Sequence, residues 1–168
     1  QPRSRGLGDV YKRQGSMLMI AEFDPVHPER LTSEPKCLSR PLYGFENTEH
    51  TINNEGPYAF YYHNKIYLAY SGGDARGYLY AIGMLTANDG DDLCDLSVWE
   101  KAKTPIASFA TIPGEYGPGH NSFFWDRDQN LWIAYHAVTS FEEKIVSSGM
   151  RRVYFEQDKT PRFDVIVE

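Results

Sequence analysis

One carboxylic acid stands in a sequence setting that suits acid–base chemistry. Glu55 lies in the stretch 53–57 (Asn-Asn-Glu-Gly-Pro), directly ahead of the aromatic run 58–62 (Tyr-Ala-Phe-Tyr-Tyr). A Glu at the mouth of a strand, with a chain-bending Gly-Pro pair behind it, is placed where a general acid can be held against a substrate. The same string is also typical of a plain turn with a solvated Glu, so the functional interpretation needs a second observation.

That second observation is an internal repeat. Residues 58–71 align without gaps on residues 123–136, at an offset of 65 residues throughout. Each copy reads as a strand, a short polar turn and a second strand, which is typical of a β-hairpin. Under the same offset Glu55 falls on His120. Each copy therefore presents one ionisable residue just ahead of its first strand.

Repeated antiparallel hairpins predict a β-propeller or a related array. The innermost strands of propeller blades line one axis, so we expect Glu55 and His120 to converge there. A single sandwich with two similar hairpins is the alternative. Other strands are expected at 18–23, 78–86, 106–112, 150–155 and 163–167, and a polar loop at 141–149.

Two further residues invite a functional interpretation. His120 lies in the stretch 116–122 (Tyr-Gly-Pro-Gly-His-Asn-Ser), whose glycines let the backbone approach another group closely. It could be a metal ligand, a substrate contact or a hydrogen-bonded core residue. Strand alternation puts Arg151 on one face with Val153 and Phe155, so its charge needs a partner or a functional role. Alternatively, Arg151 ends a strand and its head reaches water.

The composition narrows the class of protein. The 168 residues suffice for one domain, and 14% aromatic content with 12 Tyr suits a β-rich fold that stacks on sugars. A net charge of −6 makes nucleic acid an unsuitable partner. The sequence holds no apolar run of about 18 residues, so we expect no membrane span. Its two cysteines lack metal-site spacing, and we expect both to be reduced.

The beginning of the chain does not read as native sequence. Residues 4–14 (Ser-Arg-Gly-Leu-Gly-Asp-Val-Tyr-Lys-Arg-Gln) resemble the in-frame translation of a transposase-type sequencing adaptor. We therefore expect residues 1–14 to be non-native and exclude them from fold reasoning. Without them 13 of the 17 basic and 22 of the 23 acidic residues remain, so the native part is more acidic still. On this interpretation any signal peptide lies upstream, and localisation stays unassigned.

Four motifs together resemble glycoside hydrolase family 43. They are 54–57 (Asn-Glu-Gly-Pro), 66–71 (Ile-Tyr-Leu-Ala-Tyr-Ser), 116–122 and 132–136 (Trp-Ile-Ala-Tyr-His), and their order and spacing agree with the family over nearly all of residues 15–168. The resemblance implies an all-β fold, a partial five-bladed β-propeller of roughly the last two to two and a half blades. Residues 15–168 would then be the C-terminal part of a glycoside hydrolase propeller domain.

The resemblance also implies site residues. The family uses an Asp base, an Asp that orients the substrate, and a Glu acid; only the acid matches here, at Glu55, and both aspartates would lie before Gly15. The family's metal-site histidine, often on a central calcium, matches His120. Asn54 and Arg151 are candidate substrate contacts.

The chemistry agrees with the resemblance. Inverting glycosidases need an acid for the leaving oxygen and a base roughly 6.5–9.5 Å away that activates water. The acid must stay protonated near neutral pH, which requires burial or a neighbouring carboxylate. We expect an α-L-arabinofuranosidase-like enzyme acting on an oligosaccharide or a polysaccharide side chain of plant cell-wall glycans, and a chain that is inactive alone because it lacks the base. The alternatives are a β-xylosidase or related five-bladed hydrolase, and a non-catalytic carbohydrate-binding or scaffold propeller.

Overall fold

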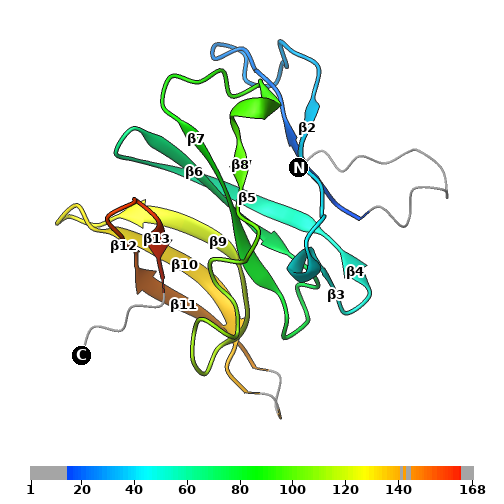
Figure 1. Ribbon diagram of the computed structural model, residues 1–168, viewed down its shortest axis with the longest axis vertical. Coiled ribbons are helices and arrows are strands. Elements are labelled where there is room, and N and C mark those ends of the chain that lie inside the picture. The colour runs from blue at the N-terminus through cyan, green and yellow to red at the C-terminus, as the bar shows by residue number, and fades with distance from the viewer. Residues whose placement is uncertain (1–14, 141, 143–144, 164–168) are drawn as a thin grey trace.

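The computed structural model describes residues 15–140, 142 and 145–163, so the segment 1–14 expected to be non-native lies outside the described residues. Nearly all of the regular secondary structure of the described residues is β-strand (Figure 1). In chain order the elements are β1 (Leu18–Ile20), β2 (Lys36–Ser39), η2 (Gly44–Glu46), β3 (Asn47–Thr48), β4 (Thr51–Ile52), β5 (Asn54–Tyr62), β6 (Lys65–Gly72), β7 (Ala81–Asn88), η3 (Leu96–Val98), β8 (Glu100–Lys101), β9 (Tyr116–Trp125), β10 (Leu131–Val138), β11 (Val146–Arg152), β12 (Tyr154–Phe155) and β13 (Pro161–Arg162).

The first copy of the repeat forms the larger sheet, an antiparallel array in the order β5-β6-β7-β8. Its leading hairpin turns at His63 and Asn64, which have φ of 46° and 62°. Two successive positive φ values are the type I′ geometry that matches the twist of the flanking strands. The resulting register pairs Glu55 with Ser71, at the end of the hairpin remote from the turn.

The second copy forms the sheet β11-β10-β9. Its hairpin turns around Asp126, whose carboxylate accepts the backbone N–H groups of Asp128 and Asn130 at 2.9 and 2.8 Å. The same carboxylate accepts the indole N–H of Trp132 at 2.7 Å, which fixes the turn onto β10. Both hairpins that the repeat predicts are therefore present.

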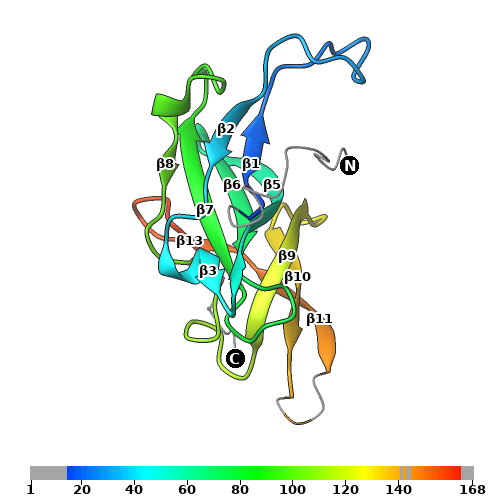
Figure 2. The same ribbon diagram turned by 90° about the vertical axis from the view of Figure 1, so that its right-hand side faces the viewer.

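The two sheets pack face to face and enclose the main core (Figures 1 and 2). Phe60 of β5 lies at its centre, with its ring 4.5 Å from that of Phe123 on β9 and stacked 4.9 Å from Tyr67 on β6. The β12-β13 hairpin closes one edge of this core, where Phe155 stacks 3.7 Å from Tyr62. Burial of each such ring contributes about 1.5–3 kcal/mol, so this interface holds the sheets together.

The N-terminal hairpin β1-β2 covers part of the opposite face of the larger sheet. Leu18 joins Leu85 and Tyr70 in a second, smaller core, on which Trp99 packs. Asp95 caps η3 by accepting the backbone N–H of Ser97 at 2.9 Å. Both cysteines are free. Among the described residues, no helix has the length and apolarity needed to cross a membrane.

Two expectations about the strands were wrong. Residues 106–112 form a single bridge, in which Ala107 pairs with Ile82, and then turn, because the Ser108 amide bonds the Thr111 hydroxyl and the Ser108 carbonyl accepts the Thr111 amide. Hydroxyl side chains there compete with the sheet ladder.

The second error concerns residues 141–149, which were expected to form a loop. β11 already begins at Val146 and pairs with β10 along its whole length. An edge strand with one open face tolerates the polar sequence 147–149 (Ser-Ser-Gly). The strand expected at 163–167 lies almost wholly outside the described residues.

Candidate functional site

Glu55 is the second residue of β5 rather than a residue ahead of the strand, as the sequence suggested. The pairing of β5 with β6 shifts register between Glu55 and Tyr58, and Gly56 inside this bulge has a φ of 56°. Bulges bend a strand and re-aim its side chains, and they are frequent beside active sites. The Gly-Pro pair therefore turns the half-buried Glu55 away from ordinary sheet alternation.

His120 lies within β9 at a second irregularity, where the pairing with β10 shifts between Ala134 and His136. Its φ is 53°, a left-handed conformation that a non-glycine residue adopts only at a cost. The backbone N–H of His120 leaves the ladder and donates to the Ser71 hydroxyl of the other sheet at 2.8 Å. Its imidazole lies over Gly56, where an added Cβ would be 3.5 Å from the ring.

Tyr80 joins the two predicted residues. Its hydroxyl donates to Glu55 Oε1 at 2.7 Å and lies 3.4 Å from His120 Nδ1. The structure thus brings Glu55 and His120 together across 65 residues of sequence, as the repeat predicts. Tyr80 is fully buried just before β7, and nothing in its sequence context indicated that it lies at the site.

His136 forms the wall behind Tyr80. The two rings are stacked at 5.6 Å with an interplanar angle of 11°. Burial lowers the pKa of His136, and the neighbouring His120 lowers it further, although a hydrogen bond to the Ala75 backbone opposes both. His136 is therefore a neutral, oriented ring near pH 7. The sequence contained one indication that His136 lies at the site, because the 65-residue offset aligns His136 with Ser71.

Asn54 is fully buried and hydrogen-bonded inside the protein. Its side-chain amide donates to Glu46 Oε1 at 2.8 Å and accepts from the Ser39 hydroxyl at 2.8 Å. These bonds describe a residue that anchors the start of β5, and a contact of Asn54 with substrate stays a prediction.

Glu46 is the charged centre of that anchor and is completely buried. Lys101 Nζ lies 2.5 Å from its Oε1. Burial by itself would raise the pKa of Glu46, but the hydrogen bonds it accepts, first among them that of Lys101, outweigh burial and lower the pKa. The other donors to this carboxylate are the backbone amides of Leu42 and Tyr43, the Tyr70 hydroxyl and the Asn54 amide.

Arg151 is also paired within the protein. Its Nη2 donates to Glu115 at 2.7 Å and its Nε donates to the Tyr135 hydroxyl at 2.7 Å. Tyr135 in turn donates to Glu115 at 2.5 Å, which closes a three-residue network. This network supplies the partner that a charge beside apolar neighbours requires. A role of Arg151 in substrate binding stays a prediction.

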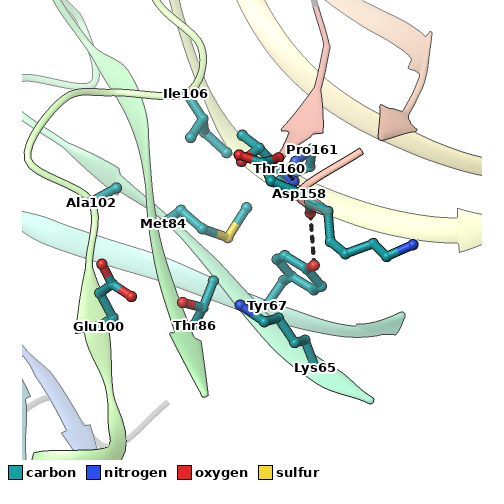
Figure 3. A pocket seen from close by; sticks show the side chains of 11 residues that line it. Lys65, Tyr67, Met84, Thr86, Glu100, Ala102, Ile106, Asp158, Thr160 and Pro161 are labelled. Carbon is teal, nitrogen blue, oxygen red and sulfur yellow. Dashed lines mark hydrogen bonds between the residues drawn. The ribbon is translucent and has the colours of Figure 1, made fainter. Parts of the chain in front are cut away.

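Two hollows of the described surface lie apart from Glu55. One, of about 320 Å³, opens between β6, β7, β8 and the β12-β13 hairpin (Figure 3). The hydroxyl of Tyr67 at its wall donates a hydrogen bond to the carbonyl of Lys159 at 2.7 Å. The other, of about 190 Å³, is an apolar groove beside β1, β2, β5 and β6. Neither is lined by Glu55, His120, Asn54 or Arg151.

The described residues around His120 do not by themselves form a calcium site. Calcium takes about six to eight oxygen ligands. His120 offers an imidazole, and the neighbouring Asn121 has a buried amide with no hydrogen-bond partner among the described residues. A group of described side chains close enough together to hold a metal ion lies elsewhere, at Glu22, Asp92 and Cys94, and both of its carboxylates are exposed. A calcium ion on His120 stays a prediction, and no chemical step is derived through it.

The fold and the clustered residues define a class of protein. Repeated antiparallel sheets of this kind are typical of β-propellers. The sequence matches the profile of Glycosyl hydrolases family 43 over residues 8–161. The chain belongs to this family.

Known proteins similar to the chain are arabinofuranosidases. It is 29% identical to an extracellular exo-α-(1→5)-L-arabinofuranosidase of Streptomyces avermitilis over 158 residues, which cover 89% of this chain and 32% of that enzyme. It is 37% identical to the enzyme of the same name from Streptomyces chartreusis over 112 residues, which cover 66% of the chain and 34% of that enzyme. The chain therefore spans about a third of the length of these curated relatives.

Solved structures agree on the fold. The α-L-arabinofuranosidase of Lactobacillus brevis superposes with a TM-score of 0.77 at 29% identity, over 88% of this chain and 46% of that one. A xylan β-1,4-xylosidase of Bacillus halodurans superposes with a TM-score of 0.67 at 14% identity, which shows the fold alone. The chain has the fold of part of a five-bladed β-propeller, with β5–β8 and β9–β11 as two of its blades.

Proposed function

We propose that the chain carries the general acid of an inverting glycosidase that releases α-L-arabinofuranosyl units from plant cell-wall glycans. Glu55 protonates the glycosidic oxygen of the leaving group. A base on the opposite face of the sugar ring activates the water that attacks the anomeric carbon. The acid gives up its proton as the bond breaks, so the leaving group departs as an alcohol.

The observation that carries this proposal is the setting of Glu55. It lies at a bulge, is half-buried, and has one carboxyl oxygen held by the buried Tyr80 hydroxyl at 2.7 Å. His120, in a left-handed conformation that favours a functional role, flanks it. The similar arabinofuranosidases support the choice of sugar.

We expect the isolated chain to be inactive. The family's base and its orienting aspartate match no residue here, and without a base water is not activated for attack. Activity should appear when the chain is part of the complete protein that its source gene encodes. His120 would contact the substrate or a metal near the axis in that protein.

The test compares leaving groups in the complete protein. Glu55→Gln should lower kcat on an alkyl or unactivated aryl arabinofuranoside by about 10²–10⁴-fold. It should leave hydrolysis of 2,4-dinitrophenyl arabinofuranoside nearly unchanged, because that leaving group needs no proton. Glu49→Gln, at an exposed residue, is the matched control.

Three outcomes would change the proposal. An unaltered rate on the unactivated substrate after Glu55→Gln removes Glu55 as the acid. Faster hydrolysis of aryl β-xylosides than of aryl arabinofuranosides makes the enzyme a xylosidase. Binding of arabino-oligosaccharides by the complete protein without any turnover points to a non-catalytic propeller. Separately, hydrolysis by the isolated chain that Glu55→Ala abolishes contradicts the expected inactivity.

A further inference from the structure

Two hydrogen bonds order the residues around Glu55. The backbone N–H of His120 on β9 donates to the Ser71 hydroxyl on β6 at 2.8 Å, which joins the two blades. Ser71 pairs with Glu55 in the register of β5 and β6. The Tyr80 hydroxyl donates to Glu55 Oε1 at 2.7 Å. Tyr80 is therefore the residue that holds the Glu55 carboxyl directly.

The direction of both bonds is fixed. A backbone amide can only donate, so Ser71 accepts from His120. A carboxyl oxygen that carries no proton can only accept, so the Tyr80 hydroxyl donates to Glu55 Oε1.

The Tyr80 phenol keeps its proton over the physiological pH range. Burial raises its pKa well above the usual value of 10 and outweighs the lowering by the nearby Ser71, and Glu55 raises the pKa further. Tyr80 is therefore a permanent donor to Glu55. Because Oε1 receives this bond, Oε2 is the oxygen that carries the proton for the leaving group.

The ring of Tyr80 is held in place by its packing. The backbone of Gly119 packs directly against the ring, and an added Cβ on Gly119 would be 2.0 Å from Tyr80 Cε1. The stacked His136 covers the ring at 5.6 Å. The glycines noted in the sequence around Pro118 therefore allow the second blade to approach the tyrosine closely.

We propose that Tyr80 is a positioning residue that fixes the Glu55 carboxyl in its reactive orientation, through a hydrogen bond from a ring that the neighbouring blade holds in place. This inference rests on the proposed role of Glu55 as the acid. Tyr80 acts through Glu55 and transfers no proton to substrate. Its second effect is to stabilise the carboxylate that remains once Oε2 has given up its proton.

The test is Tyr80→Phe in the complete protein, which removes one hydroxyl and keeps the ring. Loss of one hydrogen bond to a charged group should lower kcat on an unactivated arabinofuranoside by about 10- to 100-fold, with little change in KM. The rate on the 2,4-dinitrophenyl substrate should fall less. The pH–rate profile should also move, which a merely structural role would not cause.

Tyr67→Phe is the matched control. Tyr67 is equally buried in the same sheet, and its hydroxyl also makes one hydrogen bond, to the Lys159 carbonyl at 2.7 Å. This variant should leave the leaving-group dependence and the pH profile unchanged. Gly119→Ala, which displaces the Tyr80 ring, is the second variant, should Tyr80→Phe fail to fold, and it should shift kcat in the same direction.

The outcomes separate this inference from the proposed function. If Glu55→Gln abolishes turnover of the unactivated substrate while Tyr80→Phe and Gly119→Ala behave like Tyr67→Phe, the positioning role is wrong and the acid stands. If Glu55→Gln itself has no effect, the proposed function fails and the positioning role fails with it. Equal losses on both substrates after Tyr80→Phe indicate a packing role and also overturn the inference.

Discussion

Replacing Lys101 with Met should destabilise the chain, because the substitution leaves the buried Glu46 carboxylate without its cationic partner. The carboxylate is fully buried, and the Lys101 side chain is 14% exposed. Removing one partner of a buried ion pair costs about 3–5 kcal/mol. Four other donors still contact Glu46, so we expect the lower end, about 3 kcal/mol.

The assay is urea and thermal unfolding of the 168-residue chain at neutral pH. For a domain of this size about 3 kcal/mol lowers Tm by roughly 6–12 °C. Lys103→Met, at an exposed residue nearby, is the control and should stay within about 0.5 kcal/mol of wild type. The double variant with Glu46→Gln should recover part of the loss, because no uncompensated charge remains buried.

The pH dependence of folding stability tests independently whether Glu46 is ionised in the folded chain. The folded-state pKa of Glu46 lies below its usual 4.5. Its contribution to stability is therefore fully present above the unfolded value and is lost as the pH falls below about 4.5. Lys101→Met weakens this dependence, so its cost should shrink in acid. A loss below about 1 kcal/mol at neutral pH, or an equal loss at acidic pH, would refute a buried ionised Glu46.

Three other expectations follow from the structure. Gly119→Ala should destabilise by about 1–3 kcal/mol in urea unfolding, because its methyl group would meet the Tyr80 ring; a neutral result would mean that the two blades sit further apart. Asp126 has a pKa lowered to about 2, chiefly by the Trp132 indole, so Trp132→Phe should move its carboxyl ¹³C NMR titration toward 3.8, and an unmoved midpoint counts against that bond. His136 is held neutral, with its pKa below 6.5. The unfolded state therefore takes up a proton first, and stability should fall as the pH drops below about 6.5. His136→Phe should make the urea midpoint of unfolding less dependent on pH in this range.

Local pattern predicted much of this fold. The repeated hairpins follow from alternating apolar residues and short polar turns, and the 65-residue offset correctly brought Glu55 and His120 together. The strand predicted at residues 106–112 does not form, because side-chain hydroxyls hydrogen-bond the backbone there. The polar residues 147–149 (Ser-Ser-Gly) in the edge strand β11 give no apolar alternation that would predict a strand there.

The residues around Glu55 were harder to predict. Tyr80 is one of 12 tyrosines, and its packing against Gly119 of the second blade exists only in the folded chain. Glu46 sits in an ordinary-looking loop, and its burial depends on Lys101, 55 positions later. Such partnerships are made by tertiary structure, so single-sequence patterns do not reveal them.

The bond from the His120 amide to Ser71 also bears on how the site forms. Each hairpin closes through local contacts, which form early, whereas this bond exists only after the two blades have docked. The His120 amide belongs to no strand ladder at that point, so its hydrogen-exchange protection reports docking and not sheet formation. One backbone proton thus distinguishes a chain with two folded but separate hairpins from a chain in which Glu55 and His120 have been brought together.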